Sequence, residues 1–330
     1  MKKTGLLLLL TYALAGFAQQ AGQTTVASAA SPDTPSGQSS MVETNANFPS
    51  VQLATPTYAD LYCAGFMSKQ LLPDADYVAG GLHTPNTTKY TNGDIIYLAG
   101  QGYQPGAQYT IVRELYDVNR FESYPGQHAL ESATGQPYSE VGRIKILDTR
   151  SKNAIAQVEF SCDSILPGDI AIPFAEKTPI PYHPPIKFDR FAPPSGRLSG
   201  RIVMAKDFDT VLGTGMKVYM NVGANQGVKV GDYFRAVRSY NADFHNPVDA
   251  LSFDAPVGED TQKKQPSYQH GLLGGAWMGK SVPLNVSDLP RRAVGEVVVI
   301  GVTPTTATGM ITFALEDVHI GDGVELSTEQ

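Results

Sequence analysis

The stretch from residue 221 to residue 238, NVGANQGVKVGDYFRAVR, decides between two kinds of fold. Its glycines, at 223, 227 and 231, suit either a phosphate-binding loop or the tight turns of a β-structure. A phosphate-binding loop needs a following helix whose N-terminus faces the anion. The segment from Tyr233 to Val237 instead contains aromatic and β-branched residues, and its alternation is typical of a strand. We therefore expect Gly227 and Gly231 to be structural turn glycines of a small β-barrel.

The chain from residue 58 onward contains this pattern twice. Three blocks recur in the same order: 66–69 (FMSK) with 203–206 (VMAK), 102–113 with 227–238, and 141–169 with 294–322. The last block aligns without a gap at a constant offset of 153. Blocks that recur in one order, with insertions only between them, indicate a tandem duplication. We expect Gly142 to superpose on Gly295, and Gly168 on Gly321, as structural turn positions of one module.

Each copy alternates short apolar segments of period two with turns rich in Gly, Pro, Asn and Asp. Five or six short strands per copy, with sheet edges that must be covered, favour a small and partly closed barrel. The predicted fold is all-β: two tandem β-barrel-like modules joined by a Pro-rich linker, after a signal peptide and a disordered tether. The predicted segments are the signal peptide 1–18, the tether 19–57, module one 58–172, the linker 173–196, and module two 197–330 with a long insertion at about 239–293.

The N-terminus has the three parts of a secretory signal peptide. Lys2 and Lys3 are followed by an apolar run to Ala18, and small residues precede the predicted cleavage before Gln19. The apolar run is too short to cross roughly 30 Å of hydrocarbon. No cysteine follows the cleavage site, which argues against a lipoprotein anchor. We expect a periplasmic or secreted protein with no membrane span in the mature chain.

Charge and cysteine content narrow the partners and the compartment. The formal net charge is −7 and no run of Lys or Arg is present, so nucleic acid is not an expected partner. The chain has two cysteines, Cys63 and Cys162, and an even pair in an exported protein predicts a disulfide. We expect Cys63 on the first strand of module one and Cys162 at the end of its fifth strand. Their Cα atoms should then lie about 4.4–6.8 Å apart.

The second module also resembles proteins of the bacterial envelope. The segments 218–238 (VYMNVGANQGVKVGDYFRAVR), 294–311 (VGEVVVIGVTPTTATGMI) and 319–326 (HIGDGVEL) are similar to the C-terminal β-module of flagellar assembly protein T. They are more distantly similar to the barrel domains of the rod-shape-determining protein MreC. Residues 199–327 follow the motif order of these families, and residues 63–174 follow it less closely. The resemblance implies a β-module of a non-enzymatic scaffold outside the cytoplasm.

The sequence carries no motif for catalysis, a cofactor or a metal. The six histidines are scattered, and no HExxH, G-x-S-x-G or CxxC pattern is present. We interpret the repeated acids Asp169 and Asp322 as turn residues. The repeated Arg113 and Arg238 are expected on exposed strand faces or in local pairs, rather than at a ligand site. The sequence therefore predicts no enzyme activity, no cofactor and no metal site.

The two copies differ most between their third and fourth strands. Module one inserts residues 118–140 there, and module two inserts about 239–293, which holds the single tryptophan, Trp277. Long loops on a rigid barrel commonly carry binding function. We expect Phe253, Tyr268 and Trp277 to form a partner-binding loop. The alternative for Trp277 is that it caps the core of its own barrel.

Together these features predict a non-catalytic, exported scaffold or assembly factor of the cell envelope that binds envelope proteins. Two alternatives stay open. One is a module that binds peptidoglycan or another glycan through aromatic loop residues. The other is a hydrolase whose site is assembled from loops.

Overall fold

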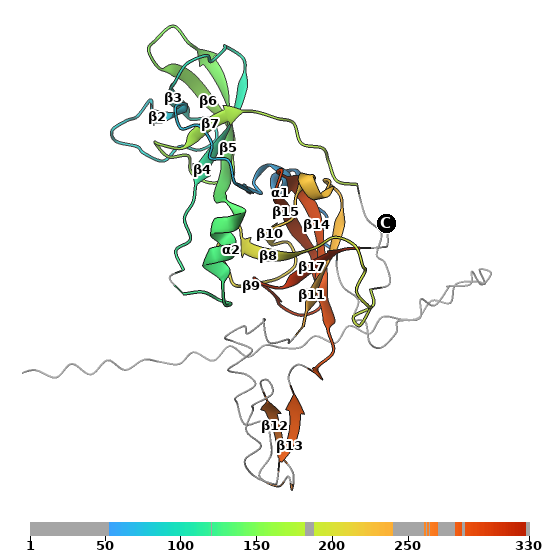
Figure 1. Cartoon of the computed structure of the whole chain (residues 1–330). Coiled ribbons are helices and arrows are strands. Elements are labelled where there is room, and N and C mark those ends of the chain that lie inside the picture. Colours follow the sequence, from blue (N-terminus) through green and yellow to red (C-terminus); the bar gives the residue numbers. More distant parts are fainter. Residues whose placement is uncertain are drawn as a thin grey trace, which may run out of the picture. The chain divides into compact units, whose positions relative to one another are not determined.

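The computed structural model describes residues 53–119, 121–181, 188–239, 261, 263, 265–269, 281–285 and 288–327, the two short ranges 265–269 and 281–285 by their backbone. The predicted signal peptide and residues 19–52 of the predicted tether lie outside the described residues. Strands dominate the described chain and form two closed six-stranded barrels in tandem (Figure 1). The predicted all-β tandem fold is therefore confirmed.

The first barrel consists of six antiparallel strands. They are β2 (Tyr77–Gly81), β3 (Ile95–Ala99), β4 (Gln108–Glu114), β5 (Gln136–Asp148), β6 (Ala154–Ser161) and β7 (Ile170–Pro173). Around the ring they follow the order β5-β4-β7-β2-β3-β6, and β6 returns to β5. A short seventh strand, β1 (Phe66–Ser68), pairs with β5 outside this ring.

The second barrel has the same construction. Its strands are β8 (Ser199–Ala205), β10 (Lys217–Met220), β11 (Tyr233–Arg238), β14 (Arg292–Val302), β15 (Ala307–Ala314) and β17 (Gly323–Leu326). Two strand pairs are separate from the ring: β9 (Val211–Leu212) with β16 (Val318–His319), and β12 (Gln265–Gln269) with β13 (Ser281–Asn285). The described helices are α1 (Tyr58–Tyr62), α2 (Gln127–Thr134) and the 3-10 helix η1 (Ala224–Gln226).

The ring of the second barrel, β14-β11-β17-β8-β10-β15, repeats that of the first strand for strand. Individual hydrogen bonds repeat as well. Val78 N donates to Asp169 O at 2.9 Å, and Ile202 N donates to Asp322 O at 3.0 Å. Gly168 N and Gly321 N return bonds to Val78 O and Ile202 O, both at 2.8 Å. The duplication thus extends from the sequence to single backbone contacts.

One of the three aligned blocks was matched wrongly. Residues 66–69 were aligned with 203–206, but 203–205 belong to β8, which pairs with β10 and β17. The strand of module one with the equivalent pairs is β2, which pairs with β3 and β7. Residues 66–68 form the added strand β1 instead. The mistake arose because FMSK and VMAK share an apolar pattern that many short strands have.

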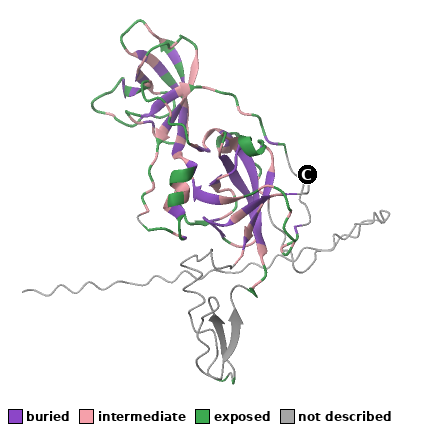
Figure 2. Ribbon diagram, in the orientation of Figure 1, coloured by how far each residue is buried: buried purple, intermediate pink, exposed green. Residues whose placement is uncertain are grey.

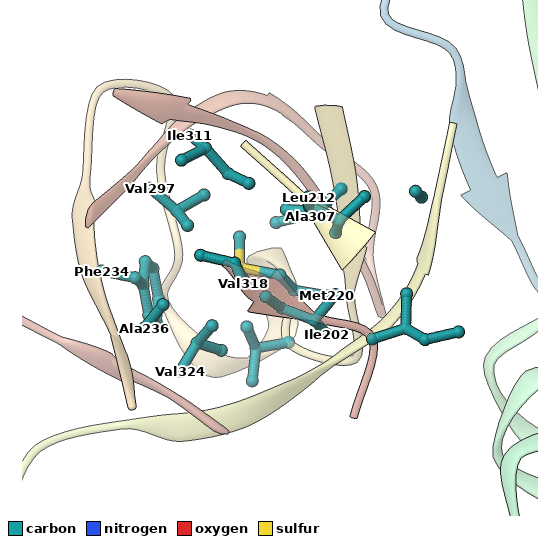
Figure 3. Close-up of a cluster of buried hydrophobic side chains, with 14 of the residues drawn as sticks. Ile202, Leu212, Met220, Phe234, Ala236, Val297, Ala307, Ile311, Val318 and Val324 are labelled. Carbon is teal, nitrogen blue, oxygen red and sulfur yellow. The ribbon is translucent and has the colours of Figure 1, made fainter. Parts of the chain in front are cut away.

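Apolar side chains fill both barrels. In the second barrel the cluster includes Ile202, Met220, Phe234, Val297 and Ile311, which point into the ring in Figure 3. The first barrel has an equivalent cluster around Ile96, Ile111 and Ile144. Figure 2 shows buried residues along the strands of both barrels and exposed residues in the connections. Each barrel therefore has a packed interior.

Gly142 and Gly295 were predicted as turn positions, but they lie inside strands β5 and β14, so the turn assignment is wrong for these two. As strand glycines they allow close backbone approach at equivalent places in both barrels. A Cβ at Gly142 would lie 2.7 Å from Phe160 O, and one at Gly295 would lie 2.6 Å from Phe313 O. Either distance is too short for any side chain. Four turn glycines have backbone φ in the left-handed region, which favours glycine; they are Gly168 (94°), Gly227 (87°), Gly231 (93°) and Gly321 (92°).

The Pro-rich linker packs apolar side chains against the second barrel. Ile180 is buried with Tyr233 and Val298, and Phe188 packs edge-on against Phe313 with ring centroids 4.9 Å apart. Among the described residues of 174–181 and 188–198, none belongs to a helix or strand. Proline content predicts extended backbone, but it does not predict which apolar residues in it are buried.

Candidate functional site in the β4–β5 insertion

The aromatic residues predicted to bind partners lie mostly outside the described residues. Phe253 and Trp277 are among the residues not described, and Tyr268 lies in β12, where it is opposite Leu284 of β13 in a parallel pair. The predicted binding role of the 239–293 insertion therefore stays a prediction.

The repeated arginines and aspartates form structural pairs. Arg238 Nε and Nη2 donate to the two carboxylate oxygens of Asp322, at 2.9 and 2.7 Å, and both residues are buried. In the first barrel Arg113 donates to Asp169 in the same way, at 2.8 and 2.9 Å. The local pairing of the arginines is confirmed, and the exposed-face alternative is wrong for Arg238. These pairs join β4 to the turn before β7, and β11 to the turn before β17.

Residues 54–68, here called the inter-barrel segment, contact both barrels. The segment begins at barrel two, where Ala54 N donates to Thr312 O at 2.7 Å. Its helix α1 is capped by Thr57, whose hydroxyl accepts from Asp60 N at 3.2 Å. Asp60 also pairs with Lys217 of β10, and Leu61 is buried beside Val298. The helix therefore packs on the outside of the second barrel.

The second half of the segment carries three further hydrogen bonds from barrel two. Tyr219 Oη donates to Ala64 O at 3.1 Å, Thr308 Oγ1 to Gly65 O at 3.0 Å, and Thr306 Oγ1 to Met67 O at 2.8 Å. Side chains of one barrel thus bond the backbone of a segment whose end, β1, pairs with the other barrel. This arrangement fixes the segment between the two barrels.

The predicted disulfide is confirmed and attaches this segment to barrel one. Cys63 and Cys162 are bonded, with Cα atoms 5.6 Å apart. Cys162 follows β6 as predicted, but Cys63 is the C-terminal cap of α1 and not a strand residue. A partly buried ion pair lies nearby: Lys177 Nζ donates to both carboxylate oxygens of Glu140, at 2.6 and 2.7 Å. Sequence periodicity alone did not separate this helical segment from the first strand.

The insertion between β4 and β5, residues 115–135, also reaches the second barrel. Tyr124 is buried in the apolar cluster of barrel two, and its ring lies over Gly321, where a Cβ would be 2.6 Å from Tyr124 Cδ1. Asn119 Nδ2 donates to Phe208 O at 3.1 Å. Helix α2 contacts β8 (Figure 1), and Leu130 packs against the same barrel. The insertion is thus anchored to barrel two through Tyr124, Asn119 and α2.

On either side of Asn119 the insertion exposes three large apolar side chains. Tyr116 is 79%, Val118 63% and Phe121 86% exposed. Single exposed apolar residues are common, but several on one short segment mark an interaction surface. Aromatic side chains are frequent anchors of protein interfaces. Tyr116, Val118 and Phe121 are therefore the candidate recognition surface of the described chain.

The same insertion brings together three potential metal ligands. Asp117, His128 and Glu131 each offer a ligand atom, and these atoms lie within 4.8 Å of one another. Glu122 is adjacent, with its carboxylate 3.8 Å from His128 Nδ1. Burial raises the pKa of the Glu131 carboxyl, and the negative charges of Asp117 and Glu122 raise it further, against the lowering effect of the hydrogen bond from Gln127. The cluster is thus an electrostatically unfavourable gathering of acids around one imidazole.

No known protein-family model matches the sequence, and no curated protein matches it significantly. Over the residues that the structure describes, no helix has the length and hydropathy to span a membrane.

Sequence reasoning missed the role of the first insertion. Its alignment gap was visible, and so were its aromatic residues Tyr116, Phe121 and Tyr124. The burial of Tyr124 against Gly321 depends on how the insertion folds back onto barrel two, which no periodicity encodes. The alignment gap at residues 118–140 is the available sequence signal, and it is shorter than the gap that contains Trp277.

Proposed function

We propose that the protein is an exported, non-catalytic scaffold of the cell envelope that acts by binding other proteins. The signal-peptide pattern of residues 1–18 supports export. The Cys63–Cys162 disulfide supports it independently, because disulfides persist mainly in oxidising compartments outside the cytoplasm. The resemblance of residues 199–327 to envelope β-modules supports a scaffold role.

The observation that carries protein binding is the exposure of Tyr116, Val118 and Phe121 on an anchored segment. Asn119 and Tyr124 hold neighbouring backbone on barrel two, so the backbone of this segment loses little further freedom on binding. Apolar burial against a partner would then contribute directly to affinity.

The insertion at about 239–293 is proposed as a second recognition element. It joins β11 to β14, the strands equivalent to β4 and β5, so both barrels carry their main insertion at the same place in the ring. Phe253, Tyr268 and Trp277 are its candidate contact residues.

Site-specific photo-crosslinking in cells tests the proposal. A photoreactive residue at position 121 is expected to form discrete adducts with one or a few envelope proteins. The same residue at position 147 is the matched control, because Leu147 is 47% exposed on β5, away from the insertion. Changing Tyr116 and Val118 to Ser should remove the adducts at position 121. Identical adducts at positions 121 and 147 would show that Tyr116, Val118 and Phe121 are not the recognition surface.

Binding to a glycan is the second candidate, because exposed Tyr116 and Phe121 rings would also stack on sugars. Sedimentation with purified cell-wall sacculi distinguishes glycan binding from protein binding. Sedimentation that is lost in Tyr116→Ala and Phe121→Ala, without protein adducts at position 121, would favour the glycan. Turnover in a hydrolase screen, removed by one acidic or His substitution, would favour the enzyme alternative.

A further inference from the structure

We infer that Asp117, His128 and Glu131 form a binding site for a divalent transition-metal ion of the Zn²⁺ class, with the β4–β5 insertion as its scaffold. This site is independent of the proposed scaffold function of the protein. Four features support it: the donor atoms, their orientation, the charge around them, and a buried hydroxyl whose pKa is influenced by Glu131 and Glu122.

The donor set matches the ion class. His128 and Glu131 are three residues apart on α2, so they lie on the same face of the helix. Asp117 comes from the chain before the helix, and all three donor atoms lie within 4.8 Å of one another. One imidazole with two carboxylates suits Zn²⁺ and related ions, whereas Mg²⁺ and Ca²⁺ prefer oxygen ligands alone. The partial exposure of the site leaves room for water as a fourth ligand.

Hydrogen bonds outside the donor set hold one oxygen of each carboxylate. Asn119 N donates to Asp117 Oδ1 at 2.8 Å, and Gln127 Nε2 donates to Glu131 Oε1 at 2.7 Å. Gln127 is buried and accepts in turn from Ser123 N at 2.7 Å. Outer-shell bonds of this kind orient the ligands of metal sites. The second oxygen of each carboxylate remains for an ion.

The carboxylates of this region favour the binding of a cation. Among the residues that the structure describes, neither Asp117 nor Glu131 makes an ion pair with Lys or Arg. Glu122 adds a third carboxylate, and His128 is its one ion-pair partner within the described chain. Three acids and one imidazole carry excess negative charge at neutral pH. A bound dication would offset that charge.

An independent feature is the Tyr124 hydroxyl. It is a buried side-chain oxygen with no hydrogen-bond partner among the described residues. Burial raises the pKa of Tyr124; the positive charge of Arg201, whose guanidinium lies over the ring at 5.7 Å, opposes this rise, and the charges of Glu131 and Glu122 add to it. Buried polar groups without a partner are rare in native proteins and commonly mark an absent water or ion. A water on the bound ion would supply the missing partner.

Isothermal titration calorimetry of the untagged chain with Zn²⁺ alone, after chelator treatment and dialysis, tests the inference. We expect saturable binding of one ion per chain. His128→Ala and Glu131→Gln should each weaken Zn²⁺ binding by about tenfold or more. His83→Ala is the matched control, since His83 is an exposed histidine in the turn after β2 and should leave binding unchanged.

Thermal unfolding provides a second test that does not depend on measuring the heat of Zn²⁺ binding. Zn²⁺ should raise the unfolding temperature of the unchanged chain, because a ligand that binds the native state stabilises it. His128→Ala should remove that shift without lowering the unfolding temperature in chelator, since its side chain is 44% exposed. Loss of the shift in His128→Ala and its retention in His83→Ala would support the site. No binding in the unchanged chain, or equal binding in His128→Ala, would overturn it.

Discussion

A pair of one arginine and one aspartate links a strand to a turn in each barrel, and Arg238 with Asp322 is the buried pair in the second barrel. The carboxylate of Asp322 accepts from Arg238 Nε and Nη2, and Asp322 Oδ2 also accepts from His319 N at 2.8 Å. The equivalent carboxylate, that of Asp169, accepts from Arg113 and from Leu166 N at 2.7 Å. A charge buried in a barrel wall is tolerated when it is paired and hydrogen-bonded. The duplication has preserved the whole arrangement in both barrels.

Arg238→Ala should lower the free energy of unfolding by about 3–5 kcal/mol, because it leaves the Asp322 carboxylate buried without its bidentate partner. Arg113→Ala should cost less, since the Arg113 side chain is 23% exposed and that of Arg238 is 8% exposed. Urea unfolding measures both. Arg150→Ala is the matched control, because the Arg150 side chain is 91% exposed. An Arg238→Ala effect no larger than that of the control would contradict a structural role for the pair.

The ion pair between Asp60 and Lys217 should make stability depend on pH. Burial raises the pKa of Asp60, but hydrogen bonds from Lys217 and Thr57 outweigh it and bring the pKa below its ordinary value of 3.8. Such a group stabilises the fold above its unfolded-state pKa, and this is lost as pH falls through the folded-state pKa. Asp60→Asn should therefore lower the free energy of unfolding at about pH 7 and have little effect at about pH 2. Guanidinium unfolding at both pH values measures the difference, and an equal loss at both would refute it.

At the scale of elements, the inter-barrel segment depends on its disulfide. Cys63 and Cys162 are 99 residues apart, and removing the bond by Cys63→Ser with Cys162→Ser should cost up to about 4–5 kcal/mol of stability. Denaturant unfolding of the oxidised protein and of the double variant measures the cost. A reducing agent should destabilise the unchanged protein and leave the variant unaffected. Free thiols on labelling of the denatured, unreduced protein would refute the bond.

The sequence predicted the repeated strands because alternation and turn glycines are local signals. The ungapped match of residues 141–169 with 294–322 identified β5, β6 and the turn before β7. It also identified their counterparts in the second barrel: β14, β15 and the turn before β17. The disulfide was predicted from the expected oxidising compartment and from the even number of cysteines. The assignment failed at β1 and α1, which are three and five residues long, too short to show a period. The cluster of Asp117, His128 and Glu131 was invisible because its members meet only when residues 115–135 fold.

At the scale of the whole molecule, the two barrels share contacts that a simple tandem arrangement would lack. The described residues from 53 to 327 belong to one compact unit. The inter-barrel segment is bonded to one barrel by Tyr219, Thr306 and Thr308 and to the other by its disulfide. Tyr124 adds a buried side chain of the first insertion to the core of the second barrel. We therefore expect the barrels to unfold together, as one cooperative unit.

Differential scanning calorimetry of the oxidised chain tests this central claim most directly. The contacts described above predict one transition, with calorimetric and van't Hoff enthalpies that agree. Tyr124→Ala combined with Cys63→Ser and Cys162→Ser should separate it into two transitions, one for each barrel. Leu147→Ala, at an exposed position of β5, should leave the single transition intact. Two resolved transitions in the unchanged, oxidised protein would contradict the account.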